Sequence, residues 1–230
     1  MKRFYKHAAT EAIDGGWRAT LDGRPIRTAG RRPQIVPAQA LAEALAAEWA
    51  RQGETIDTTS FHYRDLVDFT IDAVAPARET VIDELLPYAE TDTLCYRADP
   101  DEHLYKRQLE IWEPLLSAAE ARLGVEFARI SGIMHKAQPA GTLTRLRGEL
   151  EACSDFELAA LKMLSSLAAS LVIALEAIRP EADPQALWRA AELEADWQVE
   201  QWGDDWEAAE RRAAHFEAFT LAISLAALSR

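Results

Sequence analysis

The chain has 230 residues, enough for one large domain or two small ones that each bury an apolar core. It carries 25 Lys and Arg against 38 Asp and Glu, so its formal charge at pH 7 is −13. This acidic excess repels phosphate backbones and argues against general nucleic-acid binding. With 49% hydrophobic residues, the composition is typical of a folded protein and not of a disordered chain.

The N-terminal residues and the cysteines indicate a compartment. Lys2, Arg3 and Lys6 are not followed by an apolar stretch, which a secretory signal would require. The longest nearly uncharged apolar segment lies between Lys162 and Glu176, and it is shorter than the roughly 20 residues that span a bilayer. The two cysteines form no spaced cluster and suit free thiols. We therefore expect a cytoplasmic protein without membrane insertion.

The first part of the chain is basic and has a strand pattern. Residues 1–37 hold eight Lys or Arg against three Asp or Glu, whereas the remainder is strongly acidic. Between residues 17 and 28, large or apolar side chains alternate with polar ones around Asp22-Gly23, which favours a two-residue type I′ turn and a β-hairpin. We expect Leu21 opposite Arg24, Trp17 opposite Thr28, and a third short strand over residues 34–36. The expected inward face consists of Trp17, Ala19, Leu21 and Ile26.

After Pro37 the hydrophobic period changes from two to about 3.6. An apolar stripe from Ala38 to Trp49 predicts the first amphipathic helix. Residues 125–134 are expected to form one further strand. The sequence thus predicts an α+β protein, with an N-terminal domain over residues 1–60 that contains the β-hairpin and first helix, and a helical domain over residues 61–230. Its helices are expected near residues 64–74, 78–90, 101–123, 142–151, 154–178, 184–202 and 204–228.

Catalytic signatures are absent from the sequence in their usual forms. It contains no phosphate-binding glycine loop and no nucleophile elbow, and its histidines lack metal-ligand spacing, so we expect no cofactor and no enzyme. The alternative is a small hydrolase that uses Asp92 or His103 as its acid/base group. A thiol nucleophile at Cys95 is disfavoured, because the neighbouring acid raises the thiol pKa.

Four arginines cluster around the predicted hairpin. This run could receive an anion or the acidic surface of a partner protein, and a solvated rim explains it equally well. The chain would then be a structural or regulatory partner of another protein. The residues are Arg24, Arg27, Arg31 and Arg32.

Tryptophan is unusually frequent, with seven residues, four of them between positions 188 and 206. If residues 184–202 form one helix, Trp188 and Trp202 share a face and Trp197 lies nearly opposite. Such a helix must be covered on two sides, by its own protein or by another one. Acids are interleaved with these rings, so a thick core and a protein-binding surface both remain open.

Several stretches together resemble one family. They are residues 21–28, 47–52 with Glu54 and Ile56, 88–97, 112–116 and 197–203, and they run in this order over nearly the whole chain. The chain is thereby similar to the assembly chaperone of F-type ATP synthase that holds the alpha subunit of the catalytic head. It departs from the family pattern at residues 61–64, at Asp68 and at Ala195, where relatives often carry a second acid.

The resemblance implies an ATP-independent chaperone with the alpha subunit as its partner and with no cofactor. It also implies a β domain followed by a helical domain, and the missing transit peptide suggests a bacterial relative, which we expect to be monomeric. Trp49 would fix the junction between the two domains or contact the client. The candidate residues for protein binding or for the domain junction are Trp49, Gln52, Asp92, Arg97, Trp197, Gln198, Trp202, Arg24 and Arg27.

Overall fold

The structure is a computed structural model that describes residues 1–132, 136–203 and 205–230. The chain divides into two compact units. The β unit contains Met1–Arg78 with Ser154–Ala160 and Ser224–Arg230, and the helical unit contains Glu79–Cys153 with Leu161–Ile223. In the part of the chain that is described, no helix has the length and apolarity to cross a membrane. The domain boundary expected after residue 60 stays a prediction.

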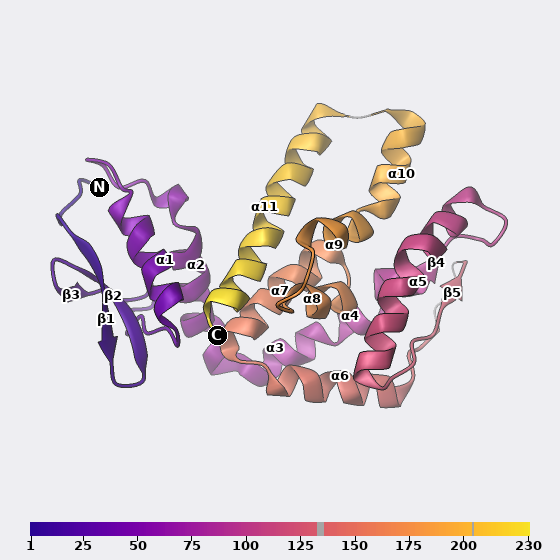
Figure 1. The fold of residues 1–230 in the computed structure, drawn as a ribbon, viewed down its shortest axis with the longest axis horizontal. Coiled ribbons are helices and arrows are strands. Elements are labelled where there is room, and N and C mark those ends of the chain that lie inside the picture. The colour runs from indigo at the N-terminus through magenta and orange to yellow at the C-terminus, as the bar shows by residue number, and fades with distance from the viewer. Residues whose placement is uncertain (133–135, 204) are drawn as a thin grey trace. The chain divides into compact units, whose positions relative to one another are not determined.

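A three-stranded antiparallel sheet begins the β unit, in the order β1 (Ala8–Ile13), β2 (Gly16–Leu21) and β3 (Arg24–Pro25). Helix α1 (Gln39–Ala50) packs against β1 and β2 (Figure 1). Its buried side chains lie along one face, as the sequence pattern predicted, because that face meets the sheet. The predicted α+β class is confirmed.

The turn between β2 and β3 has the predicted form. Asp22 and Gly23 have φ angles of 48° and 77°, both positive as a type I′ turn requires. Leu21 pairs with Arg24 across the turn, as expected. The Asp-Gly pair therefore fixes the register of this hairpin.

Strand pairing then stops earlier than predicted. Trp17 pairs with Val36 in an isolated bridge, so the expected pair with Thr28 is wrong. Thr28 is held elsewhere, because its hydroxyl donates to Asp72 Oδ1 at 2.8 Å. The third strand expected over residues 34–36 is reduced to this single bridge at Val36.

The β unit continues through short helical elements. These are η1 (Thr58–Ser60), α2 (His62–Phe69), the π-helical turn η2 (Thr70–Val74) and η3 (Ala75–Ala77). The helix predicted near residues 64–74 is thus confirmed as α2 and η2, which follow each other directly.

The later elements are mostly helices, with one parallel pair of very short strands. Trp112, in the helix predicted near residues 101–123, is fully buried, and its indole N–H donates to the carbonyl oxygen of Ala190 at 2.7 Å. The elements are α3 (Arg78–Leu85), α4 (Pro87–Glu90), η4 (Thr93–Cys95), β4 (Tyr96–Arg97), α5 (His103–Leu123), β5 (Ile130–Ser131), α6 (Ala140–Ala152), α7 (Asp155–Ala168), α8 (Leu171–Ala177), α9 (Pro184–Ala191), α10 (Leu193–Trp202) and α11 (Trp206–Leu228).

Three of the predicted helices are each broken in two. Pro87 begins α4 because its missing N–H suits the first turn of a helix. Ala169 has a φ angle of 47°, and the Ser170 hydroxyl then caps α8 by accepting from the backbone N–H of Ile173. The third break falls at Glu192, between α9 and α10.

The strand expected over residues 125–134 is shorter than predicted. Within residues 125–132, which the structure describes, β5 is the only strand, and it pairs in parallel with β4. Ile133 and Met134, which the prediction included, lie outside the described residues.

Candidate functional site

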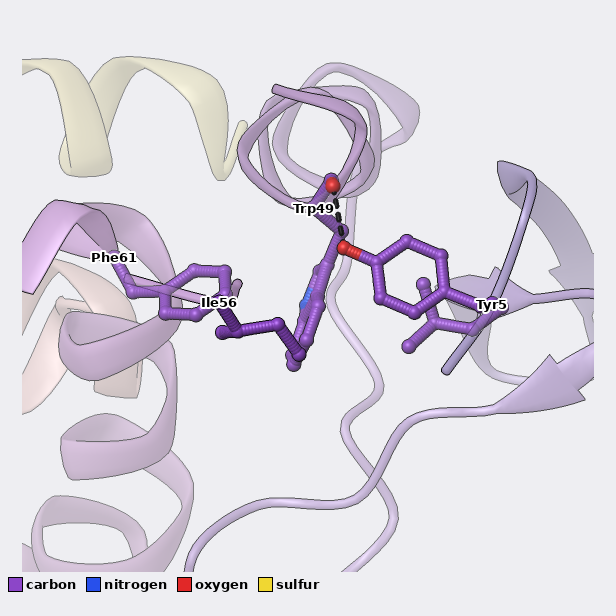
Figure 2. Packing of buried hydrophobic residues seen from close by; sticks show 5 residues of the cluster. Tyr5, Trp49, Ile56 and Phe61 are labelled. Atoms are coloured by element: carbon purple, nitrogen blue, oxygen red, sulfur yellow. Dashed lines mark hydrogen bonds between the residues drawn. The ribbon is translucent and has the colours of Figure 1, made fainter. Parts of the chain in front are cut away.

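Trp49 lies in the core of the β unit, near the end of α1, with 8% of its surface exposed. Its ring meets Tyr5 edge-on at 5.6 Å and Phe61 at 4.4 Å, measured between ring centroids (Figure 2). The Tyr5 hydroxyl donates to the Trp49 carbonyl oxygen at 2.6 Å. Leu21 and Ile56 complete this cluster. The surroundings of the ring are therefore those of a packed core residue.

Gln52 is buried just after the same helix. Its side-chain amide donates to the Ser60 hydroxyl at 2.8 Å, and its side-chain oxygen accepts from the Asp57 backbone N–H at 2.7 Å. Arg3 donates to the Gln52 carbonyl oxygen at 2.6 Å. Gln52 thus holds the N-terminal segment and the loop after α1 together.

Asp92 is fully buried in the helical unit. Its Oδ1 accepts from the Leu94 backbone N–H at 3.0 Å and from the Ser170 hydroxyl at 2.7 Å, and its Oδ2 accepts from the Val172 backbone N–H at 3.0 Å. Burial raises the pKa of this carboxyl to about 6, against the opposing effect of these donors. Asp92 therefore caps η4 and ties it to the start of α8.

Arg97 belongs to a network of charged side chains in the same unit. Its side chain is 2% exposed, and it donates to the Leu94 carbonyl oxygen at 3.1 Å and to Glu113 at 2.9 Å. Arg129 donates to Glu113 at 2.7 Å and also pairs with Glu120. The hydrogen bond from Arg129 holds the pKa of Glu113 below its usual range. The network connects β4 and α5 with the segment that precedes β5.

The hydrolase hypothesis requires Asp92 and His103 in one water-filled pocket. Asp92 is fully buried with both carboxylate oxygens bonded, whereas His103 is exposed on the first turn of α5. Burial, and then the charge of Asp92, raises the pKa of the Cys95 thiol to about 12, the direction expected from the sequence. Within the described residues, no group of three or more His, Cys, Asp or Glu could hold a metal ion. Asp92 and His103 therefore do not share a water-filled pocket.

Two large apolar side chains are exposed where α10 ends and α11 begins. Trp202 is 83% exposed and Trp206 is 72% exposed. Asp205 and Glu207 beside Trp206 are also exposed. Gly203 ends α10 with a φ angle of 88°. We call Trp202 and Trp206 the tryptophan tip; exposure of two indoles four residues apart in the sequence is typical of a protein-binding surface.

The helical wheel drawn for residues 184–202 is wrong, because the break at Glu192 separates α9 from α10. Trp188 packs against Phe219 at 5.3 Å and Phe216 at 6.0 Å between ring centroids. It therefore has a different environment from Trp202, although the wheel put both on one face.

Of the other two candidates on α10, Trp197 contacts α5. Trp197 is half-buried, and the Arg107 guanidinium lies over its ring at 5.5 Å from the centroid. Arg107 also forms an ion pair with Glu200 at 2.6 Å. Gln198 is exposed. Trp197 thus combines a structural contact with some exposed surface on the same helix as Trp202.

A hollow of about 610 Å³ lies beside the hairpin of the β unit. Arg24 and Arg27, both predicted candidates, line it and are exposed. Sequence reasoning missed Phe4, which also lines the hollow and is 63% exposed; an aromatic residue next to Arg3 was the available signal. We call this hollow the hairpin groove, and its apolar lining consists of Phe4, Tyr5, Leu21, Pro25, Ile26 and Trp49.

Comparisons with known proteins cover the whole chain. The family model described as "ATP12 chaperone protein" matches residues 2–120. The crystal structure of Atp12 from Paracoccus denitrificans is similar with a TM-score of 0.95 and 33% identity, over 100% of this chain and 98% of that one. A protein from Agrobacterium tumefaciens, described as a candidate chaperone, is similar with a TM-score of 0.94 and 34% identity, over 100% and 86% of the two chains. The mitochondrial protein atp12 of Schizosaccharomyces pombe is 27% identical over 215 residues, which are 88% of this chain and 74% of that protein.

Proposed function

Since the chain belongs to the ATP12 chaperone family, we propose that it holds the unassembled alpha subunit of F-type ATP synthase until the catalytic head is assembled. The similarity to Atp12 over the full length of the chain carries this proposal. Members of the family are chaperones and not enzymes. The hydrolase alternative has no observation in its favour.

The physical task explains why no catalytic group is needed. An unassembled subunit exposes the surface that its neighbours later cover, and such surfaces aggregate. A chaperone shields this surface by reversible contact, without nucleotide hydrolysis. Its affinity must be low enough for the next subunit to displace it.

We assign the client contact to the tryptophan tip, with Trp197 and Gln198 at its edge. Exposed indoles support this assignment, because tryptophan contributes strongly to binding when a partner buries it. The acids around Trp206 would favour a client surface that carries positive charge. The hydrogen-bonded, buried candidates, Trp49, Gln52, Asp92 and Arg97, would act by maintaining the two units.

We further propose that the protein works as a monomer in a bacterial cytoplasm. Bacterial sources of the two solved relatives support this compartment, although another relative is mitochondrial. Among the described residues, Cys95 and Cys153 form no disulfide, which fits a reducing compartment.

Co-expression with the alpha subunit alone tests the proposed function. The chain should increase the soluble fraction of alpha and elute with it in size-exclusion chromatography. Trp202→Ala combined with Trp206→Ala should reduce the complex, whereas Leu109→Ala, which removes a partly exposed apolar side chain of α5, should leave it intact. Separate elution of the two wild-type proteins at both low and high salt would contradict the proposal.

A further inference from the structure

The hairpin groove has an apolar floor and a basic rim. Tyr5, Leu21 and Trp49, which line the floor, belong to the buried cluster of the β unit. Because the Tyr5 hydroxyl is bonded to a backbone carbonyl, this residue presents its ring and not a free polar group. The volume of about 610 Å³ lies in the range of binding pockets for small ligands and side chains.

The positive charge on the rim has no carboxylate partner among the described residues. The Arg24 side chain makes no hydrogen bond or ion pair there, and the Arg27 guanidinium donates only to the Arg31 carbonyl oxygen at 2.9 Å. Most of the other arginines in the described residues pair with a carboxylate, as Arg18 and Arg107 do with glutamates.

The acid that lines the groove is bonded to backbone groups and makes no ion pair with the two rim arginines in the described residues. Asp22 accepts hydrogen bonds from the backbone N–H groups of Lys6 at 3.0 Å and His7 at 2.9 Å. These bonds hold the pKa of Asp22 below its usual range, so the carboxyl stays ionised while it is bonded to the N-terminal segment. The two arginines therefore remain available to an acidic ligand.

The edge strand β3, beside the groove, is poorly suited to pair with a strand from a partner protein. Strand β3 has two residues, and one of them is Pro25, which has no N–H to donate to a neighbouring strand. A ligand in the groove must then be held mainly by contacts with side chains.

We propose that the hairpin groove binds a short peptide segment of a partner protein in which acidic residues flank an apolar or aromatic side chain. The apolar side chain lies on the floor beside Trp49, and the carboxylates pair with Arg24 and Arg27. Phe4 covers the segment from the side, since its ring is exposed and meets Tyr5 edge-on at 5.3 Å. This proposal depends on the proposed function only in the identity of the partner protein that carries the segment.

The test uses the full chain and a short synthetic peptide in which Asp alternates with Phe and Leu. Titration followed by amide chemical shifts should perturb residues 21–27 and the Trp49 indole, with binding that weakens as salt rises. The same peptide with Lys in place of Asp should not bind. Arg24→Glu combined with Arg27→Glu should weaken binding of the Asp peptide by about tenfold or more.

Two further variants separate specific binding from general charge effects. Arg51→Glu makes the same type of charge change at an exposed position outside the groove and should leave the affinity nearly unchanged. Phe4→Ala should weaken binding without unfolding the chain, because the ring is 63% exposed.

Other outcomes would overturn the inference. Equal binding of the Lys and Asp peptides would contradict the proposal that the ligand is acidic. Unchanged affinity of the double arginine variant for the Asp peptide would contradict it as well. Self-association that the double arginine variant abolishes would assign the groove to a second copy of this chain. If the chain binds the peptide and does not bind the alpha subunit, only the proposed function is contradicted. If it binds the alpha subunit and not the peptide, only the groove proposal is contradicted.

Discussion

Replacement of Trp49 by alanine should destabilise the β unit strongly. The ring is 8% exposed and packs against both Tyr5 and Phe61. Truncation of a large buried aromatic residue costs about 3 to 5 kcal/mol of unfolding free energy. The hydrogen bond from the Tyr5 hydroxyl reaches the backbone carbonyl of residue 49 and is kept in the variant, so it does not increase the expected loss of unfolding free energy. The loss is a large part of a typical stability of about 5 to 15 kcal/mol.

Urea denaturation monitored by circular dichroism measures this effect, and hydrogen exchange in β1 and α1 locates it in the β unit. Trp202→Ala is the matched control, because an indole that is 83% exposed should contribute only about 0.5 kcal/mol or less. Trp49→Phe should fall between alanine and wild type, since it keeps an aromatic ring. A Trp49→Ala protein with a near-wild-type midpoint would refute the packing argument.

Three further results are expected. Burial raises the pKa of Asp92 from 3.8 to about 6, so between these pH values the folded state holds a proton on this carboxyl that the unfolded state has lost. Relative to Asp92→Asn, the unfolding free energy of the wild type should therefore fall by about 2 kcal/mol as pH rises from about 4.5 to 7.5. A difference between the two proteins that stays constant with pH in urea titrations would contradict this. Arg97→Met leaves the Leu94 carbonyl oxygen without that donor and should cost about 1 to 3 kcal/mol in the same assay, whereas an unchanged midpoint would argue against the network. A thiol reagent at pH 8 should modify Cys153 and spare Cys95 until the protein unfolds, and rapid modification of both would show that Cys95 is accessible.

The sequence predicts those elements whose signals are local. Asp22-Gly23 gave the turn because its backbone angles depend on these two residues. Strand β1 was missed although Asp14-Gly15 precedes β2, because its mostly small and half-exposed side chains give little hydrophobic alternation. The break at Ala169 was also missed, since alanine favours helices and only the capping by Ser170 reveals the start of α8.

The candidate site was predicted in part. The sequence identified Trp202 as an unusual residue, and it could not separate core from surface because a helical wheel assumes one unbroken helix. The groove brings together Phe4, Arg24 and Trp49, which are distant in sequence and meet only through the fold. The structural role of Asp92 could not be predicted from the sequence either, because its partner Ser170, at the start of α8, is distant in sequence.

Light scattering by the alpha subunit diluted from denaturant tests most directly whether the chain shields an orphan subunit through the tryptophan tip. Wild-type protein at a stoichiometric amount should suppress aggregation without ATP. The variant with Trp202→Ala and Trp206→Ala should suppress it much less while it keeps the wild-type unfolding midpoint. Equal suppression by the two proteins would contradict the assignment of the client contact, and aggregation undiminished by the wild type would contradict the holding function itself.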